Sequence, residues 1–263
     1  MPLQAPLLLV AGVLLTVLPG LKAQTQGNPR VEASPSSFTL LYREGPPGQA
    51  GREKFLYSRD DGARAEIFSP GSPGYTGWEP KTLVLPELRK RFLIAERARL
   101  VSTFFLSAAD ADFRKRPLIS ENCAHEAGSK ATLAGQESIL GVHTYHFESP
   151  AEAGMPGIDT WLAPKLGCFG IQTIHSGAGQ DGVFTRVFER VPLSLAFAPP
   201  PGSVFEPPAP DFREVPPSEQ QKAVLGQVRG TPFGWVASDA HLEKGFARFD
   251  RNYEQARQYG PGK

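Results

Sequence analysis

The sequence predicts a β-dominated α+β protein built on an antiparallel sheet, with a helix near its C-terminus. The first observation is a series of short runs in which apolar and polar residues alternate, the pattern of half-buried strands. The second is that short segments rich in Gly, Pro and Asp join these runs, with no helices between them. The third is an apolar stripe at helical spacing between Ser238 and Tyr259.

The first half of the chain contains a predicted hairpin. Strand candidates at 38–43 and 54–59 are separated by a loop over 45–48. Asp60-Asp61-Gly62 is a strong turn signal, and a third strand candidate follows at 63–68. An Asp-Gly turn between two such runs indicates antiparallel pairing.

The segment after this hairpin permits two interpretations. Gly and Pro residues predict a loop over 69–80, and 83–85 is a short apolar run. The apolar residues of 86–98 fit a second helix, but weak alternation over 92–101 also fits a strand. Residues 100–106 are richer in β-forming types.

The second half contains the clearest strands. The candidates lie at 135–147, 158–162, 169–174 and 183–191. Within the first of them, the even-numbered residues from Val142 share one face and the odd-numbered residues from His143 share the other. Short strands at hairpin spacing are typical of an antiparallel sheet.

Two different segments follow these strands. Prolines exclude a central strand or a helix interior over 192–217, so we expect this segment to lie extended across the surface, anchored by Phe205 and Phe212. Ser238 can then cap a helix that ends near Gly260. Its apolar stripe consists of Leu242, Phe246, Phe249 and Tyr253. Such a stripe must be buried, and we expect it to pack on the sheet.

The N-terminus carries an apolar run over 6–18, which Pro19-Gly20 interrupts before the small residue Ala23. This pattern is typical of a secretory signal peptide that is cleaved after Ala23. The run is shorter than the roughly 20 residues that span a bilayer, although an uncleaved membrane anchor is the alternative. We therefore expect a periplasmic or secreted protein.

These observations divide the chain into four parts. They are a signal peptide at 1–23, a disordered lead-in at 24–37, a sheet domain at 38–217 that ends in the Pro-rich segment, and a C-terminal helical extension at 218–263.

Charge and cysteine content restrict the classes of partner. The formal net charge of +1 falls to zero when Lys22 leaves with the signal peptide, so no electrostatic footprint for nucleic acid is present. Cys123 and Cys168 are the two cysteines of the chain, and in an oxidising compartment they predict one disulfide. Two unpaired buried thiols are the alternative.

No motif predicts a catalytic residue, a metal site or a cofactor. His143 and His146 point to opposite faces of a strand, and no third ligand is near them in sequence. Cys123 and His125 could form a nucleophile and its base, which requires a free thiol. The sequence has no phosphate-binding loop, dinucleotide fingerprint or Gly-x-Ser-x-Gly elbow.

Three runs, at 137–145, 159–168 and 204–212, carry a resemblance to a known class. They resemble uncharacterised secreted bacterial proteins that are similar to the outer-membrane lipoprotein carrier class. The resemblance covers 131–217 and implies a curved antiparallel sheet, an incomplete barrel wrapped over helices, with an apolar cavity.

The predicted function is therefore non-enzymatic binding of an apolar ligand or lipid in the concavity of the sheet. The candidate lining residues are strand aromatics: Phe104, Tyr145, Phe147, Trp161, Phe184 and Phe188. The alternative is an interaction or scaffold module that binds a cell-envelope protein through the Pro-rich segment and the terminal helix. A second alternative is a hydrolase that uses Cys123 and His125.

Overall fold

The computed structural model describes residues 37–49, 51–108, 110–111, 123–151, 157–178, 184–228, 250–251 and 253–258. All of them belong to one compact unit, Ala33–Lys263. The predicted signal peptide, and the lead-in except for Ser37, lie outside the described residues.

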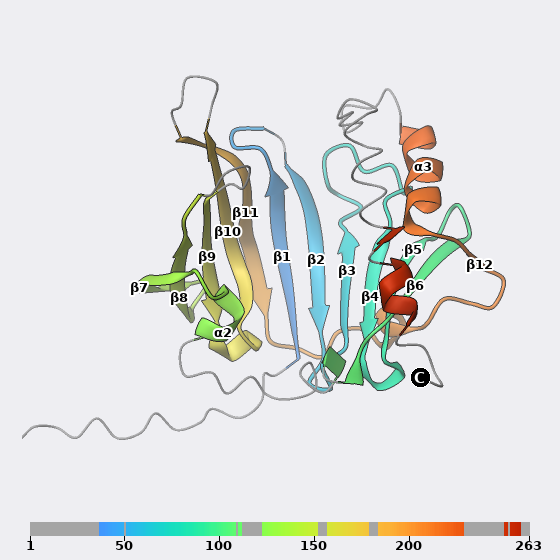
Figure 1. The fold of residues 1–263 in the computed structure, drawn as a ribbon, viewed down its shortest axis with the longest axis horizontal. Helices are drawn as coiled ribbons and strands as arrows, with labels where there is room; N and C mark the ends of the chain where they lie inside the picture. The colour runs from blue at the N-terminus through green and yellow to red at the C-terminus, as the bar shows by residue number, and fades with distance from the viewer. Residues whose placement is uncertain are drawn as a thin grey trace, which may run out of the picture. The chain divides into compact units, whose positions relative to one another are not determined.

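The described backbone of this unit forms one open, curved sheet of twelve strands, in the order β12-β6-β5-β4-β3-β2-β1-β11-β10-β9-β8-β7 (Figure 1). The strands are β1 (Phe38–Gly45), β2 (Arg52–Ser58), β3 (Arg64–Phe68), β4 (Lys81–Leu85), β5 (Lys90–Ala95), β6 (Leu100–Phe105), β7 (Thr132–Ile139), β8 (Val142–Ser149), β9 (Gly157–Ala163), β10 (Phe169–Ala178), β11 (Phe184–Ala196) and β12 (Arg213–Glu214). Neighbouring strands are antiparallel, except that β12 pairs with β6 in parallel. The predicted β-dominated α+β class, a curved antiparallel sheet forming an incomplete barrel, is confirmed.

The predicted hairpin at Asp60-Asp61-Gly62 is confirmed as the connection between β2 and β3. Gly62 has a φ of 83°, which a glycine adopts without a Cβ penalty. The Asp61 carboxylate accepts a hydrogen bond from the Ala63 amide at 2.9 Å, and the Arg59 amide donates to the Ala63 carbonyl at 2.9 Å. The turn residues therefore fix the register of the two strands.

The possible helix over 86–98 is wrong. Only one turn of 3-10 helix, η1 (Pro86–Leu88), forms before Arg89 enters the left-handed region at a φ of 51°. The chain then extends as β5, and the side chains of Phe92 and Ile94 are buried on one face of the sheet. A strand forms here because the segment pairs with β4 on one side and β6 on the other, which buries its alternating apolar residues.

The strand register defines two faces. Directly opposite residues of an antiparallel pair share a face, so Phe38, Leu40 and Tyr42 of β1 mark one face, which we call the inner face. Two helices pack on it: α2 (Ala124–Ala127) next to Phe147 and Leu162, and α3 (Pro217–Val228) next to Ala95 and Leu100. In Figure 1 this face is toward the viewer, and α2 lies over β9 and β10.

The prediction that prolines exclude a central strand from residue 192 onward is wrong for 192–196, which continue β11 and pair with β1 inside the sheet. The register shifts beside Pro192, an irregularity at which a sheet tolerates proline. The rest of the Pro-rich segment covers part of the opposite, outer face. It includes the 3-10 turn η3 (Gly202–Phe205). As predicted, Phe205 and Phe212 anchor it: Phe205 is buried and Phe212 is partly buried against an apolar cluster that includes Leu83 and Phe92.

The two cysteines form a disulfide, so the prediction of a bridge is confirmed and the alternative of two thiols is wrong. Cys123 precedes α2, and Cys168 lies between η2 (Pro164–Leu166) and β10, with their Cα atoms 5.4 Å apart. The bridge therefore fastens α2 to the β8–β10 side of the sheet.

The predicted C-terminal helix lies largely outside the described residues, including Leu242, Phe246 and Phe249 of its stripe. Residues 250–251 and 253–257 are helical. Tyr253 is buried, with its ring edge-on to Phe104 at a centroid distance of 5.4 Å. Among the described residues, no helix has the length and apolar character needed to cross a membrane.

Candidate binding site on the inner face of the sheet

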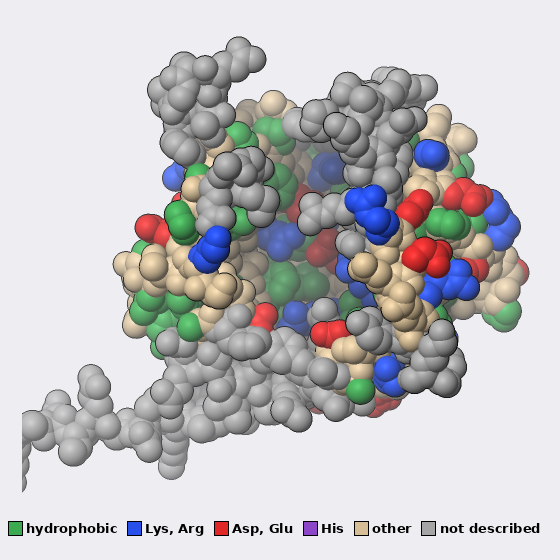
Figure 2. Space-filling model, in the orientation of Figure 1, with side chains coloured by type: hydrophobic (Ala, Val, Ile, Leu, Met, Phe, Trp, Pro, Cys, Tyr) green, Lys and Arg blue, Asp and Glu red, His purple; other side chains and the backbone are tan. Residues whose placement is uncertain are grey.

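The inner face is covered at its flanks and hollowed in its middle. Helix α2 contacts β9, and α3 contacts β5 and β6. Between these flanks lie the inner faces of β1, β2, β3 and β11. Figure 2 shows this hollow, in which hydrophobic and charged side chains form the floor. We therefore consider the central strands as the candidate site.

Five side chains from four adjacent strands form a charged cluster on this floor. The floor cluster consists of Tyr42, Glu44, Lys54, Glu66 and Arg190. Lys54 Nζ forms an ion pair with the Glu44 carboxylate and lies 3.4 Å from Glu66 Oε1. Arg190 Nη2 lies 3.4 Å from the second oxygen of Glu44. The ionised side chains of the cluster are between 12% and 29% exposed, so water screens them poorly.

Burial and neighbouring charges set the ionisation of this cluster. Burial, followed by the charge of Glu66, raises the pKa of Tyr42, so its hydroxyl remains protonated. Burial alone would also raise the pKa of the Glu66 carboxyl. The Lys54 ammonium, the neighbouring Tyr42 hydroxyl and the Arg190 guanidinium together outweigh that effect, and the pKa is lowered. At neutral pH the cluster therefore combines a neutral phenol donor, two carboxylates and two cations.

Two donors of the cluster have no hydrogen-bond partner. The described residues contain three buried side-chain polar atoms without a hydrogen bond, and two of them are the Tyr42 hydroxyl and Arg190 Nε. The Tyr42 hydroxyl lies within hydrogen-bonding reach of the Glu66 carboxylate, and each group shifts the pKa of the other, but the two are not aligned as a well-formed hydrogen bond. Buried polar groups are nearly always hydrogen-bonded, so each exception requires an explanation. They lie on neighbouring side chains, with the Arg190 guanidinium 4.6 Å from the centre of the Tyr42 ring, which makes these two side chains the candidates for polar contact with a ligand.

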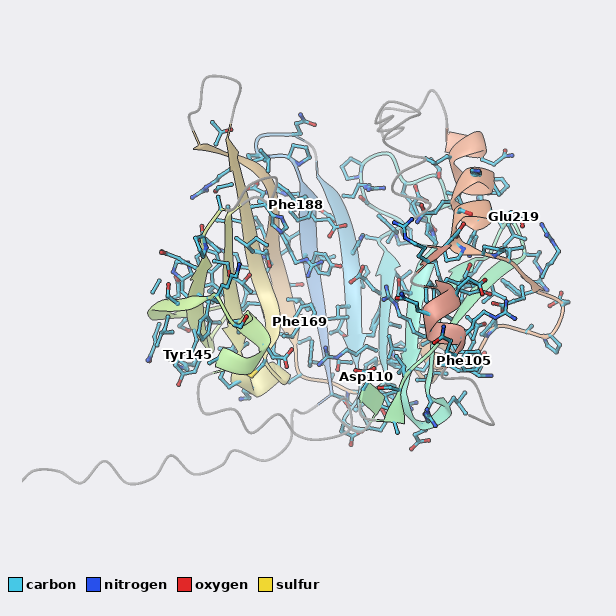
Figure 3. The ribbon with its side chains drawn as sticks, in the orientation of Figure 1. Phe105, Asp110, Tyr145, Phe169, Phe188 and Glu219 are labelled. Carbon is cyan, nitrogen blue, oxygen red and sulfur yellow. A yellow bond between two sulfur atoms is a disulfide. The ribbon has the colours of Figure 1, made fainter. Side chains whose placement is uncertain are left out.

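Aromatic rings border the cluster and leave part of its surface apolar. Lys54 Nζ lies 4.6 Å from the centre of the Phe68 ring. The guanidinium groups of Arg64 and Arg190 lie 5.7 and 5.9 Å from the centre of the Phe169 ring. These cation–π contacts orient the cations while the rings supply apolar area. Figure 3 shows Phe169 near the middle of the sheet.

The predicted lining residues are dispersed, and no single cavity unites those that the structure describes. Four of them, Phe104, Tyr145, Phe147 and Phe188, lie on the inner face by register. Phe104, on β6, and Tyr145, on β8, lie on opposite flanks of the sheet, and Phe147 is buried in the apolar cluster beside α2. Phe188, also labelled in Figure 3, is central, with His175 edge-on to its ring at 5.2 Å.

The remaining two predicted lining residues are Trp161 and Phe184, and the structure describes the side chain of Trp161 alone. Trp161 lies on the outer face, because it is opposite His146, and the two rings stack at a centroid distance of 4.1 Å. Phe184 begins β11, and its side chain lies outside the described residues.

The only residues in the described part of the chain that combine as candidate metal ligands are His146, Glu148 and Asp159. They share the outer face of β8 and β9, and their ligand atoms lie within 4.8 Å of one another. An imidazole and two carboxylates are ligand types that Zn²⁺ accepts. No metal was predicted from the sequence, because no third ligand lies near His143 and His146 along the chain. Asp159 meets His146 through the pairing of β8 and β9. His143 is exposed on the other face of β8.

The hydrolase alternative is wrong for Cys123, because its sulfur is bonded to Cys168 and a disulfide sulfur cannot act as a thiolate nucleophile. The side chain of His125 lies outside the described residues.

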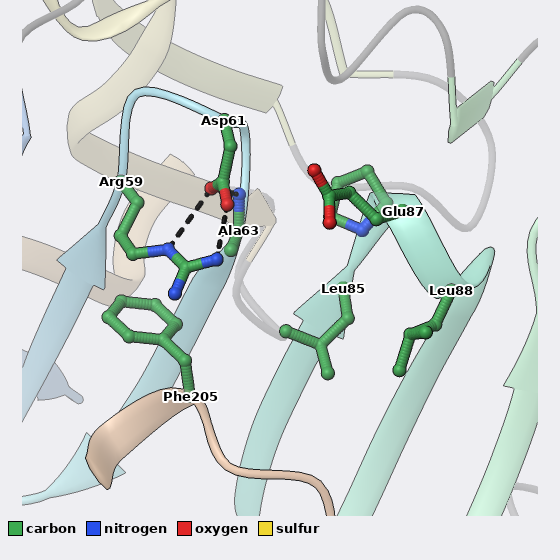
Figure 4. A pocket seen from close by; sticks show the side chains of 8 residues that line it. Arg59, Asp61, Ala63, Leu85, Glu87, Leu88 and Phe205 are labelled. Atoms are coloured by element: carbon green, nitrogen blue, oxygen red, sulfur yellow. Dashed lines mark hydrogen bonds and ion pairs between the residues drawn. The ribbon is translucent and has the colours of Figure 1, made fainter. Parts of the chain in front are cut away.

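A pocket of about 220 Å³ lies on the outer face, between the β2–β3 turn and η1 (Figure 4). Its lining includes Arg59, Asp61, Leu85 and Phe205. The Arg59 guanidinium is paired with Asp61 and lies 4.7 Å from the centre of the Phe205 ring. These side chains satisfy one another, so the pocket offers no unpaired donor comparable to those of the floor cluster.

Comparison with known proteins assigns no family. No family model matches the chain, and no curated protein matches it. Similar solved structures include an uncharacterised conserved protein from Thermus thermophilus, with 6% identity and a TM-score of 0.42, over 69% of this chain and 90% of that one. MucB in the Pseudomonas aeruginosa MucA/MucB complex has 13% identity and a TM-score of 0.40, over 68% of this chain and 58% of that one.

A LolA superfamily protein, NE2245 from Nitrosomonas europaea, is also similar, with 12% identity and a TM-score of 0.29, over 66% of this chain and 91% of that one. At these identities and TM-scores, the similarity assigns no function to this chain.

Proposed function

We propose that this protein binds a ligand with an apolar chain, such as a lipid, in the hollow of its inner face. The observation that supports the proposal is that no helix of the described residues covers the central strands between α2 and α3, while aromatic rings remain on their inner face. Hollows with apolar walls and a few placed polar groups are typical of small-molecule sites.

The proposed location is outside the cytoplasm, in the periplasm or the secreted fraction. The disulfide between Cys123 and Cys168 supports this proposal, because such bridges persist in oxidising compartments. The apolar N-terminal segment, with its small residue at Ala23, supports it independently.

A fluorescence titration tests apolar binding. The probe is N-phenyl-1-naphthylamine, an uncharged molecule whose emission rises in apolar surroundings. We expect saturable binding to the full chain, weakened about fivefold or more by Phe68→Ser, because truncating a partly buried aromatic removes roughly 1–3 kcal/mol of apolar contact.

Ile67→Ser is the matched control, because Ile67 neighbours Phe68 on β3, is also partly buried and faces the outer side. The proposal fails if the probe does not bind saturably, or if both variants weaken it equally.

A further inference from the structure

We propose that the ligand has an anionic head group, a carboxylate or a phosphate, which Arg190 and Tyr42 bind at the floor of the hollow. This inference rests on the proposed function and adds to it the chemical class of the ligand's polar end. Three observations support it: the unpaired donors, the local excess of positive charge and the geometry of the charged pairs.

The first observation is that both unpaired atoms are donors. Burial keeps the Tyr42 hydroxyl protonated, and Arg190 Nε carries a hydrogen that no protein acceptor in the described part of the chain accepts. The Tyr42 hydroxyl has only the poorly aligned Glu66 carboxylate beside it, and Arg190 Nε has no acceptor among the described residues. An anionic oxygen placed between these two donors is the acceptor that forms the strongest hydrogen bonds with them. A ligand with a cationic or donor-only head group would leave both of them unpaired.

The second observation is the balance of charge on the inner face of β1, β2, β3 and the adjoining part of β11. By register this area carries four cations and two carboxylates: Arg52, Lys54, Arg64 and Arg190 against Glu44 and Glu66. It therefore has a net positive charge, although the whole chain is nearly neutral. In a concave surface this excess of positive charge favours an anion.

The third observation is that the protein's own carboxylates do not occupy the available donors. Glu44 accepts from Lys54 and from Arg190 Nη2, so the guanidinium is held by one nitrogen while Nε is unused. A guanidinium commonly binds an oxyanion through two nitrogens at once. The pair with Glu44 thus fixes the orientation of Arg190 and leaves one donor for the ligand.

Competition for N-phenyl-1-naphthylamine at pH 7.5 tests this inference. Hexadecanoate and hexadecan-1-ol have the same chain and differ in the charge of the head group. We expect the wild-type protein to bind hexadecanoate about tenfold or more tightly than hexadecan-1-ol, since hydrogen bonds to a charged group are worth roughly 1.5–3 kcal/mol. Equal affinity would overturn the head-group inference and leave the proposed apolar binding intact. Failure of both to displace the probe would count against the proposed function itself.

Two variants locate the selectivity. Tyr42→Phe removes only the hydroxyl, and Arg190→Gln removes the guanidinium. We expect each to reduce the preference for hexadecanoate to about threefold or less, while the affinity for hexadecan-1-ol stays within about twofold of wild type. Arg43→Gln is the control, because Arg43 lies on the same strand as Tyr42 but is exposed and on the outer face. An unchanged preference in both variants would contradict the assignment of these residues.

A last pair of ligands separates a lipid head group from a free anion. Hexadecyl phosphate is expected to bind at least as tightly as hexadecanoate. Inorganic phosphate alone is expected to bind about a hundredfold more weakly than hexadecyl phosphate, because it lacks the apolar chain. If inorganic phosphate bound as tightly as hexadecyl phosphate, the anion site would be supported and the apolar ligand would be excluded.

Discussion

The flanks and the centre of the inner face treat buried polar groups in opposite ways. On the α3 flank, Gln220 is fully buried, and its amide donates to the carbonyls of Leu93 and Leu100 at 2.9 and 3.2 Å. The buried Ser102 hydroxyl donates to the Val215 carbonyl at 2.7 Å. In the centre, the Tyr42 hydroxyl forms no hydrogen bond with the described residues.

This difference shows which part of the inner face has its buried polar groups hydrogen-bonded within the chain. Helices close the flanks, and the polar groups beneath α3 are paired within the chain. The centre holds the fully buried Tyr42 and ionised side chains that are 12–29% exposed, and two of their donors form no well-aligned hydrogen bond with the residues that the structure describes. Unpaired buried donors destabilise a fold and are retained at sites that serve another purpose. The contrast is therefore the physical basis for assigning the ligand to the centre.

The disulfide on the α2 flank is expected to have the largest effect on stability. Cys123 and Cys168 are 45 residues apart in sequence. In the chain-entropy model, closing a loop of that size contributes about 4 kcal/mol. We expect the double variant Cys123→Ala/Cys168→Ala to lose about this free energy of unfolding in a urea titration. Incubating the wild-type protein with a reductant provides the control, and a loss below about 1 kcal/mol would show that the α2 flank holds without the bridge.

Substitution of Gln220 tests the pairing on the other flank. Gln220→Leu preserves the approximate volume but removes the two hydrogen bonds that the amide donates and the one at 3.4 Å that it accepts from the Ser102 hydroxyl, and it leaves two carbonyls without that donor. We expect the free energy of unfolding to fall by about 2 kcal/mol. Gln227→Leu on the same helix is the control, because Gln227 is exposed. Equal losses for the two variants would remove the distinction between a completed flank and an open centre.

Much of the sheet could be predicted from the sequence, for reasons that are local. The Asp61-Gly62 turn defines the β2–β3 hairpin through its own backbone geometry and the Asp61 side chain. Alternation in β8 and β11 reports a period that belongs to each strand alone. The segment around Phe92 could not be assigned from sequence, because a short apolar run fits both the helical and the strand period. Its pairing with β4 and β6 makes it a strand.

The floor cluster could not be predicted, because it depends on register across several strands. Glu44 meets Arg190 only because β1 pairs with β11, and these residues are 146 positions apart in sequence. The predicted lining consisted of aromatic side chains, so it did not include the charged residues between them. The one available signal was the presence of Glu44, Lys54 and Glu66 in strands that are otherwise rich in apolar residues.

Tyr42→Phe has a small expected effect on stability, in contrast with Gln220→Leu. The hydroxyl it removes is buried and unpaired, so its loss relieves a desolvation penalty without breaking a hydrogen bond. We expect the free energy of unfolding to stay constant or to rise by up to about 1 kcal/mol. Urea titrations of ligand-free wild type and variant measure this difference. A loss as large as that of Gln220→Leu would mean that the hydroxyl is hydrogen-bonded within the folded chain, and the contrast between flank and centre would disappear.

The smallest expected effect concerns pH and His175, which lies beside Phe188 on the inner face. Burial, and then the charge of Arg190, lower the pKa of His175 below its ordinary value of 6.5. The unfolded chain therefore binds a proton more readily than the folded chain. The stability that this residue contributes is complete above pH 6.5 and declines as the pH falls toward the lowered pKa.

His175→Gln should flatten the pH profile of the urea midpoint between pH 6.5 and about 5. The acid decline from Glu66, whose lowered pKa lies below its ordinary value of 4.5, should remain at lower pH in the variant. If the two profiles coincide between pH 6.5 and about 5, His175 is not buried beside Arg190, and the centre of the inner face is more open to water than the flanks.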